Sequence, residues 1–179
     1  GHGGTGKTSL VEAMIYNTGA VKRLGKVDDG NTVADFYPEE IKRKITISTS
    51  LVPCEYKDHK INLLDTPGYA DFYFEVIGAL KATDSMLVMF SAAAGVEVQT
   101  EIVWEDSPGI PKIAFINKME REHADFYKVL NEMKDTFSDN IVPVQLPIGA
   151  EDSFKGVVDL MKMKALLFEK ATGKITEAE

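Results

Sequence analysis

The first eight residues of the chain follow the pattern G-x-x-x-x-G-K-[ST], which is typical of loops that bind phosphate groups. Three of its glycines, Gly3, Gly4 and Gly6, are expected to adopt backbone angles that a Cβ would forbid, so that successive N–H groups turn toward an anion. Lys7 would bring a positive charge to the β- and γ-phosphates, and the Thr8 hydroxyl is suited to Mg²⁺. The predicted nucleotide-binding residues of this loop are Gly3, Gly4, Thr5, Gly6, Lys7, Thr8 and Ser9.

A helix is expected directly after this loop, because Leu10, Val11, Met14 and Ile15 recur at helical spacing. The positive end of its dipole would point at the phosphates. A chance glycine-rich loop is the weaker interpretation, since the helix follows where phosphate binding requires it. A buried strand normally delivers such a loop, and nothing precedes Gly1 here, so we expect the first strand of the fold to be missing from the chain.

Two further residues could hold Mg²⁺ together with Thr8. Asp65 ends an apolar run, where its carboxylate would emerge beside the loop and bind the ion through water. Alone it would more often be a turn residue, and the upstream phosphate loop reverses that preference. Thr46 could complete the metal shell when a γ-phosphate is present, although a threonine there is also an ordinary strand former. Gly68 can offer its N–H to the γ-phosphate.

The segment Asn117-Lys118-Met119-Glu120 follows a predicted buried strand. The pattern N-K-x-D at this place reads guanine, because its carboxylate accepts hydrogen bonds from the ring N–H and the exocyclic amine while the lysine stem covers the base. Glu120 replaces the aspartate with a side chain one methylene longer. Asn-Lys alone is more often a solvated turn, and about 110 residues after a phosphate loop it becomes moderate support for guanine binding.

Hydrophobic periodicity predicts strands that alternate with helices, which favours parallel βαβ units. The fold class is therefore α/β, a P-loop NTPase with a mostly parallel sheet, helices on both faces and a missing first strand. Residues 20–44 are polar and are expected to form a long, mobile loop. The expected domains are an incomplete nucleotide-binding domain over 1–150 and the start of an inserted subdomain over 151–179. The predicted strands are 45–56, 60–64, 86–90, 112–116 and 141–148, and the predicted helices follow the loop and cover 71–83, 96–106 and 122–137.

The bulk properties exclude several classes of function. The chain has 179 residues and a formal net charge of −8, so bulk electrostatics would not hold it on nucleic acid, and any RNA contact must be local. One cysteine, Cys54, excludes an internal disulfide and fits a reducing compartment, so a cytoplasmic location is expected. No apolar run approaches the length of a membrane span. A monomer without membrane contact is expected.

Six motifs together resemble the G domain of translational GTPases, within them the elongation factor G family. They are the Gly-Lys-Thr loop, Lys-Ile-Thr-Ile at 44–47, Asp-Thr-Pro-Gly at 65–68, Gly-Val-Glu-x-Gln-Thr-Glu at 95–101, Ile-Asn-Lys-Met at 116–119, and Leu-Pro-Ile-Gly at 146–149 with the run after it. The resemblance implies binding of GTP and GDP with Mg²⁺, GTP hydrolysis, and action on the ribosome in translocation, with rRNA and ribosomal proteins as partners of the full-length protein.

The family's catalytic histidine, which follows Asp-Thr-Pro-Gly, is Tyr69 in this chain. By resemblance Tyr69 would position the attacking water, with Lys7 and Gly68 supporting catalysis. The replacement leaves a second function open, a nucleotide-gated binding module with little hydrolysis. A third, a metabolic P-loop kinase or ATPase, is disfavoured by Asn117-Lys118 and by the switch-like loop.

Overall fold

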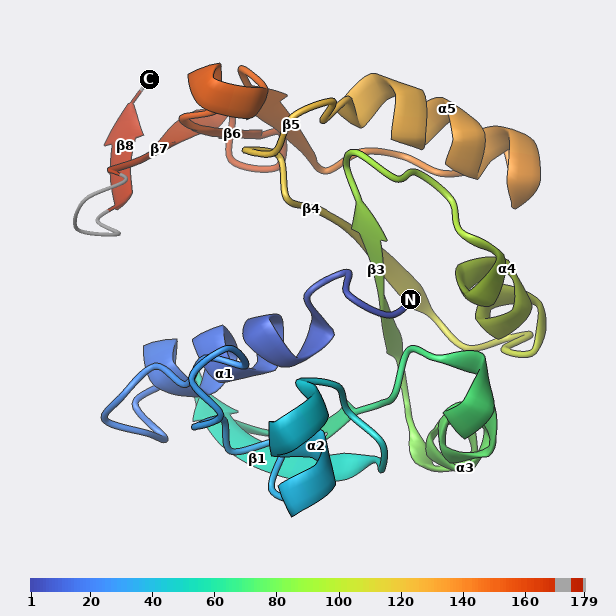
Figure 1. The fold of residues 1–179 in the computed structure, drawn as a ribbon. Coiled ribbons are helices and arrows are strands. Elements are labelled where there is room, and N and C mark those ends of the chain that lie inside the picture. Colours follow the sequence, from blue (N-terminus) through green and yellow to red (C-terminus); the bar gives the residue numbers. More distant parts are fainter. Residues whose placement is uncertain (170–174, 179) are drawn as a thin grey trace. The chain divides into compact units, whose positions relative to one another are not determined.

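The computed structural model describes residues 1–169 and 175–178, and the chain divides into two compact units. Unit 1 comprises Gly1–Met89 and Val98–Ala114, and unit 2 comprises Phe90–Glu97 and Phe115–Glu179. Figure 1 shows the elements, which in chain order are α1 (Lys7–Asn17), α2 (Pro38–Arg43), β1 (Ser50–Tyr56), β2 (His59–Asp65), a 3₁₀ turn η1 (Ala70–Phe72), α3 (Tyr73–Ala82), β3 (Met86–Ser91), α4 (Val98–Glu105), β4 (Lys112–Asn117), α5 (Phe126–Thr136), β5 (Gln145–Ile148), a 3₁₀ turn η2 (Glu151–Ser153), β6 (Gly156–Asp159), β7 (Lys164–Phe168) and β8 (Ile175–Ala178).

In unit 1, helix α1 packs on a hairpin formed by β1 and β2 (Figure 1). The hairpin closes through the two-residue turn Lys57-Asp58, whose φ angles of 48° and 62° match the turn type that fits the twist of antiparallel strands. Its register pairs Ser50 with Asp65, which fixes Asp65 at the end of β2. The core beneath α1 consists of the buried residues Val11, Ile15, Ala34, Val52 and Cys54.

Most of residues 20–44 form a loop of turns and bends, as their polarity predicted, but the end of this range is helical. Helix α2 lies within them, and two buried carboxylates bind the backbone around it. Glu12 of α1 accepts N–H bonds from Val33 at 2.6 Å and Ala34 at 3.2 Å. Glu40 of α2 has 1% of its surface exposed and accepts four backbone N–H bonds, from Phe36, Tyr37, Ile47 and Ser48. Charged side chains thus order this segment from inside, which apolar periodicity could not reveal.

Element boundaries differ from the sequence expectation for related reasons. The predicted strand 45–56 begins only at Ser50, because the backbone before it bonds to carboxylates: Ile47 and Ser48 donate to Glu40, and Thr49 donates to Glu75 at 2.6 Å. The predicted helix 122–137 begins at Phe126 as α5, since the Asp125 side chain caps its first turn by accepting the Lys128 N–H at 3.0 Å.

The α/β class agrees with the sequence. Among the described residues the strands pair in three groups, β1–β2, β3–β4 and β5–β6–β7–β8. In the β3–β4 pair the Met86 N–H bonds the Pro111 carbonyl and the Ala92 N–H bonds the Asn117 carbonyl, so the two strands run in parallel. The other described ladders are antiparallel, because short turns join their neighbouring strands.

Unit 2 contains α5 and the antiparallel meander β5–β8. Its core includes Phe90, Val129 and Met133, each at most 1% exposed, and the Phe90 and Phe137 rings lie 6.3 Å apart between centroids. The two units are defined by their internal packing, and no boundary between them falls at residue 150. The predicted domains 1–150 and 151–179 therefore stay a prediction. Residues 170–174 and 179 of that second range lie outside the described part.

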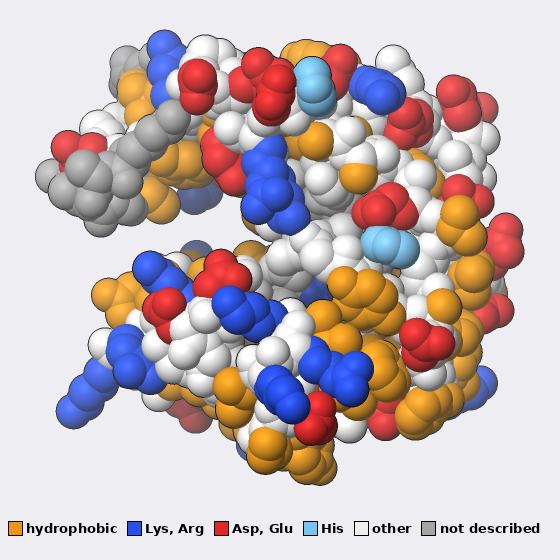
Figure 2. Space-filling model, viewed as in Figure 1, with side chains coloured by type: hydrophobic (Ala, Val, Ile, Leu, Met, Phe, Trp, Pro, Cys, Tyr) orange, Lys and Arg blue, Asp and Glu red, His pale blue; other side chains and the backbone are white. Residues whose placement is uncertain are grey.

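Charged side chains of both signs and apolar side chains share the face shown in Figure 2. Several large apolar residues are exposed in unit 1, among them Phe74 at 69% and Leu51 at 62%. Within the described ranges no helix is long and apolar enough to cross a membrane.

The four bonds to Glu40 predict that Glu40→Gln loosens residues 33–48. Each carboxylate oxygen accepts two N–H groups, whereas glutamine has one oxygen and would set its own N–H₂ against the other pair. A buried donor without a partner costs about 1–3 kcal/mol, so amide hydrogen exchange there should rise roughly tenfold or more. The control is Glu39→Gln, an exposed neighbour paired with Arg43 at 3.2 Å, which should change little. Equal exchange in both variants would contradict the role of Glu40.

Candidate functional site

The phosphate loop runs from Gly1 into the first turn of α1. Gly4 and Gly6 have φ angles of 76° and 100°, in the left-handed region that favours glycine. The Thr5 hydroxyl donates to the His2 carbonyl at 2.9 Å and closes the loop, and the Lys7 amine donates to the carbonyls of Gly1 at 3.0 Å and His2 at 2.9 Å. Gly3 is not among the positive-φ glycines, so the expectation that its backbone angles require glycine is wrong.

The segment after β2 lies directly on this loop. Gly68 is buried, and a Cβ added to it would lie 2.7 Å from the Gly3 nitrogen and would overlap the Lys7 amine nitrogen. The Tyr69 ring follows and lies against Gly3. The structure therefore brings the predicted catalytic residues Lys7, Gly68 and Tyr69 together at the phosphate loop. Ser9, by contrast, is exposed on α1.

The three predicted metal ligands also meet. The Thr8 hydroxyl donates to an Asp65 carboxylate oxygen at 2.7 Å, and its oxygen lies 3.0 Å from the Thr46 hydroxyl oxygen. Thr46 donates to Asp35 at 2.7 Å. All four side chains are at most 9% exposed. Residues from the phosphate loop, from residues 20–49 and from the end of β2 thus converge on one buried point.

Counting protons at this point shows what it is suited to bind. Each hydroxyl has one proton, and both protons are used in bonds to carboxylates, from Thr8 to Asp65 and from Thr46 to Asp35. The two hydroxyl oxygens 3.0 Å apart then face each other with lone pairs. A cation satisfies such converging oxygens, and hydroxyl and carboxylate oxygens are the ligands that Mg²⁺ prefers. The residues therefore fit the predicted metal.

The electrostatics agree with a site that attracts positive charge. Burial raises the pKa of Asp65 to about 6, opposed by the Thr8 hydrogen bond and the Lys7 charge and reinforced by Asp35 and Glu12. Burial likewise raises the pKa of Asp35, opposed by the Thr46 hydrogen bond and reinforced by Glu40 and Glu12. Among the described residues no group of three or more His, Cys, Asp or Glu side chains could hold a metal by itself. A cation here would depend on hydroxyl oxygens and on oxygens of a ligand.

Sequence reasoning missed Asp35. It lies in the polar stretch 20–44 beside other acids such as Asp28 and Asp29, and only the buried hydrogen bond to Thr46 distinguishes it. No local pattern could have selected it.

The predicted guanine-reading residues belong to unit 2. Asn117 ends β4, Lys118 has a φ angle of 65°, and Glu120 is exposed. Burial lowers the pKa of Lys118 and the Arg121 charge lowers it further, while Glu120 and Glu97 oppose the shift. The lysine is thus partly withdrawn from water, as a stem that covers a base would be.

Backbone bonds from two sides hold this segment. The Ala92 N–H donates to the Asn117 carbonyl at 2.8 Å. Glu151 donates its N–H to the Met119 carbonyl at 2.8 Å and accepts the His123 N–H at 2.7 Å. Sequence reasoning missed Glu151, because an acid after the turn Ile148-Gly149 has no distinguishing pattern.

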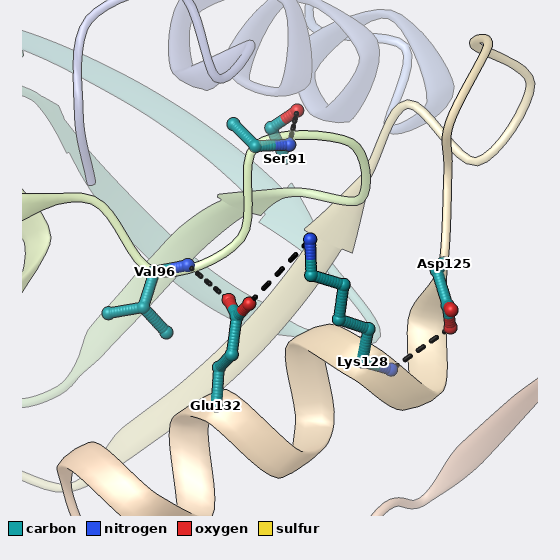
Figure 3. Close-up of polar contacts among 6 residues, drawn as sticks. Ser91, Val96, Asp125, Lys128 and Glu132 are labelled. Carbon is teal, nitrogen blue, oxygen red and sulfur yellow. Dashed lines mark hydrogen bonds and ion pairs between the residues drawn. The ribbon is translucent and has the colours of Figure 1, made fainter.

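Figure 3 shows how the loop after β3 is fixed in the same unit. Glu132 of α5 accepts the Val96 N–H at 3.1 Å and lies 3.9 Å from the Lys128 amine. Ser91 accepts the Ala94 N–H, and Asp125 caps α5. The Asp125 N–H donates in turn to Ala92, the residue that binds Asn117. Helix α5 and this loop therefore support the end of β4.

A comparison with protein families matches residues 1–174 to the elongation factor Tu GTP binding domain. The chain belongs to this family. The fold class and the resemblance expected from the motifs are thereby confirmed, and the family is one of GTP-binding domains.

Relatives of this GTP-binding domain carry further names. Elongation factor G of Granulibacter bethesdensis is 44% identical over 170 residues, which are 94% of this chain and 24% of that protein. Elongation factor G of Thermotoga petrophila is 44% identical over 178 residues, 98% of this chain and 26% of that protein. A crystal structure from Thermus thermophilus superposes with a TM-score of 0.93 at 39% identity, covering all of this chain and 27% of that one. The chain spans about a quarter of the length of the curated relatives it matches.

Burial of Asp65 predicts that Asp65→Asn stabilises the nucleotide-free protein at neutral pH. A pKa raised from 3.8 to about 6 means that the folded state binds a proton more tightly than the unfolded chain. The free energy of unfolding therefore falls as the pH rises through this range, and above it the full cost, on the order of 3 kcal/mol, is present. Asparagine keeps an acceptor for Thr8 without the charge, so the thermal midpoint should rise by several degrees.

The control for this measurement is Asp71→Asn, which changes an exposed acid of η1 and should leave the midpoint near its original value. A lower midpoint for Asp65→Asn at neutral pH would show that the ionised carboxylate stabilises the metal-free fold.

Proposed function

We propose that this chain is the GTP-binding and GTP-hydrolysing domain of an elongation factor G-like protein that acts on the ribosome in translocation. The observation that carries the proposal is the pairing of the Thr8 and Thr46 hydroxyl oxygens beside Asp65, next to the phosphate loop. Family membership and the 44% identity to proteins named elongation factor G support it. The full-length protein would work as a monomer in the cytoplasm, with rRNA and ribosomal proteins as partners.

The phosphates of GTP would lie in the loop of residues 3–9. Its N–H groups and the positive end of the α1 dipole favour an anion there. The Lys7 amine, which now donates to the Gly1 and His2 carbonyls, would turn to the β- and γ-phosphate oxygens. The Gly68 N–H would bond the γ-phosphate, since Gly68 lies beside both Gly3 and Lys7.

Thr8 and Thr46 would hold Mg²⁺ through their hydroxyl oxygens, and Asp65 and Asp35 would hold waters of its shell. The ion would neutralise charge that develops on the phosphate oxygens. Because Thr46 belongs to the segment that Glu40 orders, loss of the γ-phosphate would release that segment and give a switch.

The guanine base would be read by Asn117, Lys118 and Glu120. The Glu120 carboxylate would accept from the ring N–H and the exocyclic amine, a pattern that adenine does not offer. The bonds from Ala92 and Glu151 hold this segment in place, which favours base discrimination despite the longer acidic side chain.

Tyr69 would position the attacking water. A phenol donates one hydrogen bond and accepts weakly, and it cannot carry an imidazolium charge toward the phosphates as histidine can. Positioning with Mg²⁺ and Lys7 still supplies most of phosphoryl-transfer catalysis, so hydrolysis should be present but slower by about 10²–10⁴-fold. A nucleotide-gated binding module with little hydrolysis is the second candidate, and the presence of Tyr69 in place of histidine favours it.

The deciding experiment measures GTP binding and hydrolysis by the full-length protein with and without ribosomes. We expect tight binding and slow hydrolysis that ribosomes accelerate. Lys7→Ala should weaken GTP binding more than about 100-fold, because charge-assisted hydrogen bonds contribute about 1.5–3 kcal/mol each. Lys81→Ala, an exposed lysine of α3, is the matched control. Unchanged GTP affinity in Lys7→Ala would refute the phosphate site, and tight binding without ribosome-stimulated hydrolysis would favour the binding module.

Competition between nucleotides tests the base-reading residues. GTP should compete better than ATP, with a weaker preference than an aspartate would give, and Glu120→Asp should sharpen it. Glu122→Asp changes a neighbouring exposed acid and serves as the control. Equal competition by ATP and GTP in the original protein would exclude guanine reading by Glu120.

A further inference from the structure

Gly3 has no backbone reason to be glycine. Its φ is not positive, unlike those of Gly4 and Gly6, and the phosphate-loop pattern leaves its position open. What surrounds it is the Tyr69 ring: a Cβ on Gly3 would lie 2.8 Å, 2.9 Å and 3.0 Å from the ring atoms Cζ, Cε2 and Cε1. Carbon atoms in contact stay about 3.5–4.0 Å apart, so a side chain at residue 3 would force the Tyr69 ring to move away from the loop.

The contact involves the functional end of the tyrosine. Cζ carries the hydroxyl, and Cε1 and Cε2 flank it, so the hydroxyl-bearing edge of the ring lies over the backbone of Gly3. Gly68 approaches the same residue, since a Cβ on it would lie 2.8 Å from the Gly3 Cα. The His2 ring lies 6.4 Å from the Tyr69 ring between centroids, at 55°. Tyr69 as a residue is 41% exposed, so it contacts the loop without being buried in a core.

We propose that Gly3 is a positioning residue for Tyr69, and that the two residues act as a pair. The missing side chain at residue 3 sets the depth at which the ring lies over the phosphate loop, and with it the point from which the hydroxyl can hold a water. The proposal rests on the proposed function, because it assigns the place of a group in hydrolysis. The effect of a substitution at residue 69 should therefore depend on which residue occupies position 3.

A double-mutant cycle on the full-length protein separates this role from a general effect on the phosphate loop. The four proteins are the original, Gly3→Ala, Tyr69→Ala and the double variant, and the measurements are GTP affinity and single-turnover hydrolysis on ribosomes. Gly3→Ala should slow hydrolysis by about tenfold to 10²-fold, the size expected when a positioned group shifts by about 1 Å. In the Tyr69→Ala background the same change should cost less than about twofold, because the ring that it displaces is gone.

GTP affinity provides the second readout. If Gly3→Ala instead disturbs the phosphate-binding backbone, GTP affinity and the hydrolysis rate should each fall as much with Tyr69 present as in the Tyr69→Ala background. That result would overturn the proposal. Gly78→Ala in α3 is the matched control, because a Cβ there meets nothing within 4 Å, and it should leave both measurements unchanged.

Hydrogen exchange of residues 66–72 distinguishes failure of this proposal from failure of the proposed function. Gly3→Ala should speed exchange of these residues severalfold whether or not the protein hydrolyses GTP. The added methyl group would separate the Tyr69 ring and Gly68 from the phosphate loop, on which both now pack. If exchange is faster but the protein binds GTP without hydrolysing it, the proposed GTPase activity is refuted and the contact between Gly3 and Tyr69 is supported. Unchanged exchange would refute the role of Gly3 in positioning Tyr69 and would leave the proposed GTPase activity untouched.

Discussion

The rest of unit 1 depends on the hydrogen bond from the Thr8 hydroxyl to Asp65. It ties the phosphate loop to the end of β2, and the adjacent Thr46 oxygen ties both to residues 20–49. Two hydroxyl protons serve two carboxylates, which leaves two oxygens facing each other in a buried place. Burial raises the pKa of both carboxyl groups, because their charged forms are poorly solvated at this point. Metal binding and folding are thus linked through the same four side chains.

Buried carboxylates bring Thr46 to this point. Glu12 and Glu40 accept six backbone N–H bonds between them, all from residues 33–48. Hydrogen bonds made by internal charges are exchangeable with water once the segment opens, whereas an apolar core would resist opening. A segment held in this way can be ordered in one state and released in another, which suits the switch proposed for it.

Much of the site could be predicted from the sequence, because its residues follow fixed spacings. The loop and helix at the start, Asp65 at a strand end and Thr46 at the start of the predicted strand 45–56 were identified from pattern, and the structure brings Thr8, Thr46 and Asp65 together. Asp35, Glu40 and Glu151 were not identified, since the role of each depends on which backbone it meets. Gly3 was expected to be glycine for its φ angle, and its actual reason, the Tyr69 ring, arises from a contact 66 positions along the chain. Alternation of strands and helices predicted the α/β class, whereas the register of each antiparallel ladder could be read only from the structure.

The most direct test of this account is a crystal structure of the full-length protein with Mg²⁺ and a GTP analogue that resists hydrolysis. The account predicts that the Thr8 and Thr46 hydroxyl oxygens both lie about 2.0–2.1 Å from the ion, with Asp65 bound to one of its waters. It also predicts phosphates enclosed by residues 3–9. An ion bound away from both hydroxyls, with Thr8 still donating to Asp65 and Thr46 to Asp35, would contradict it.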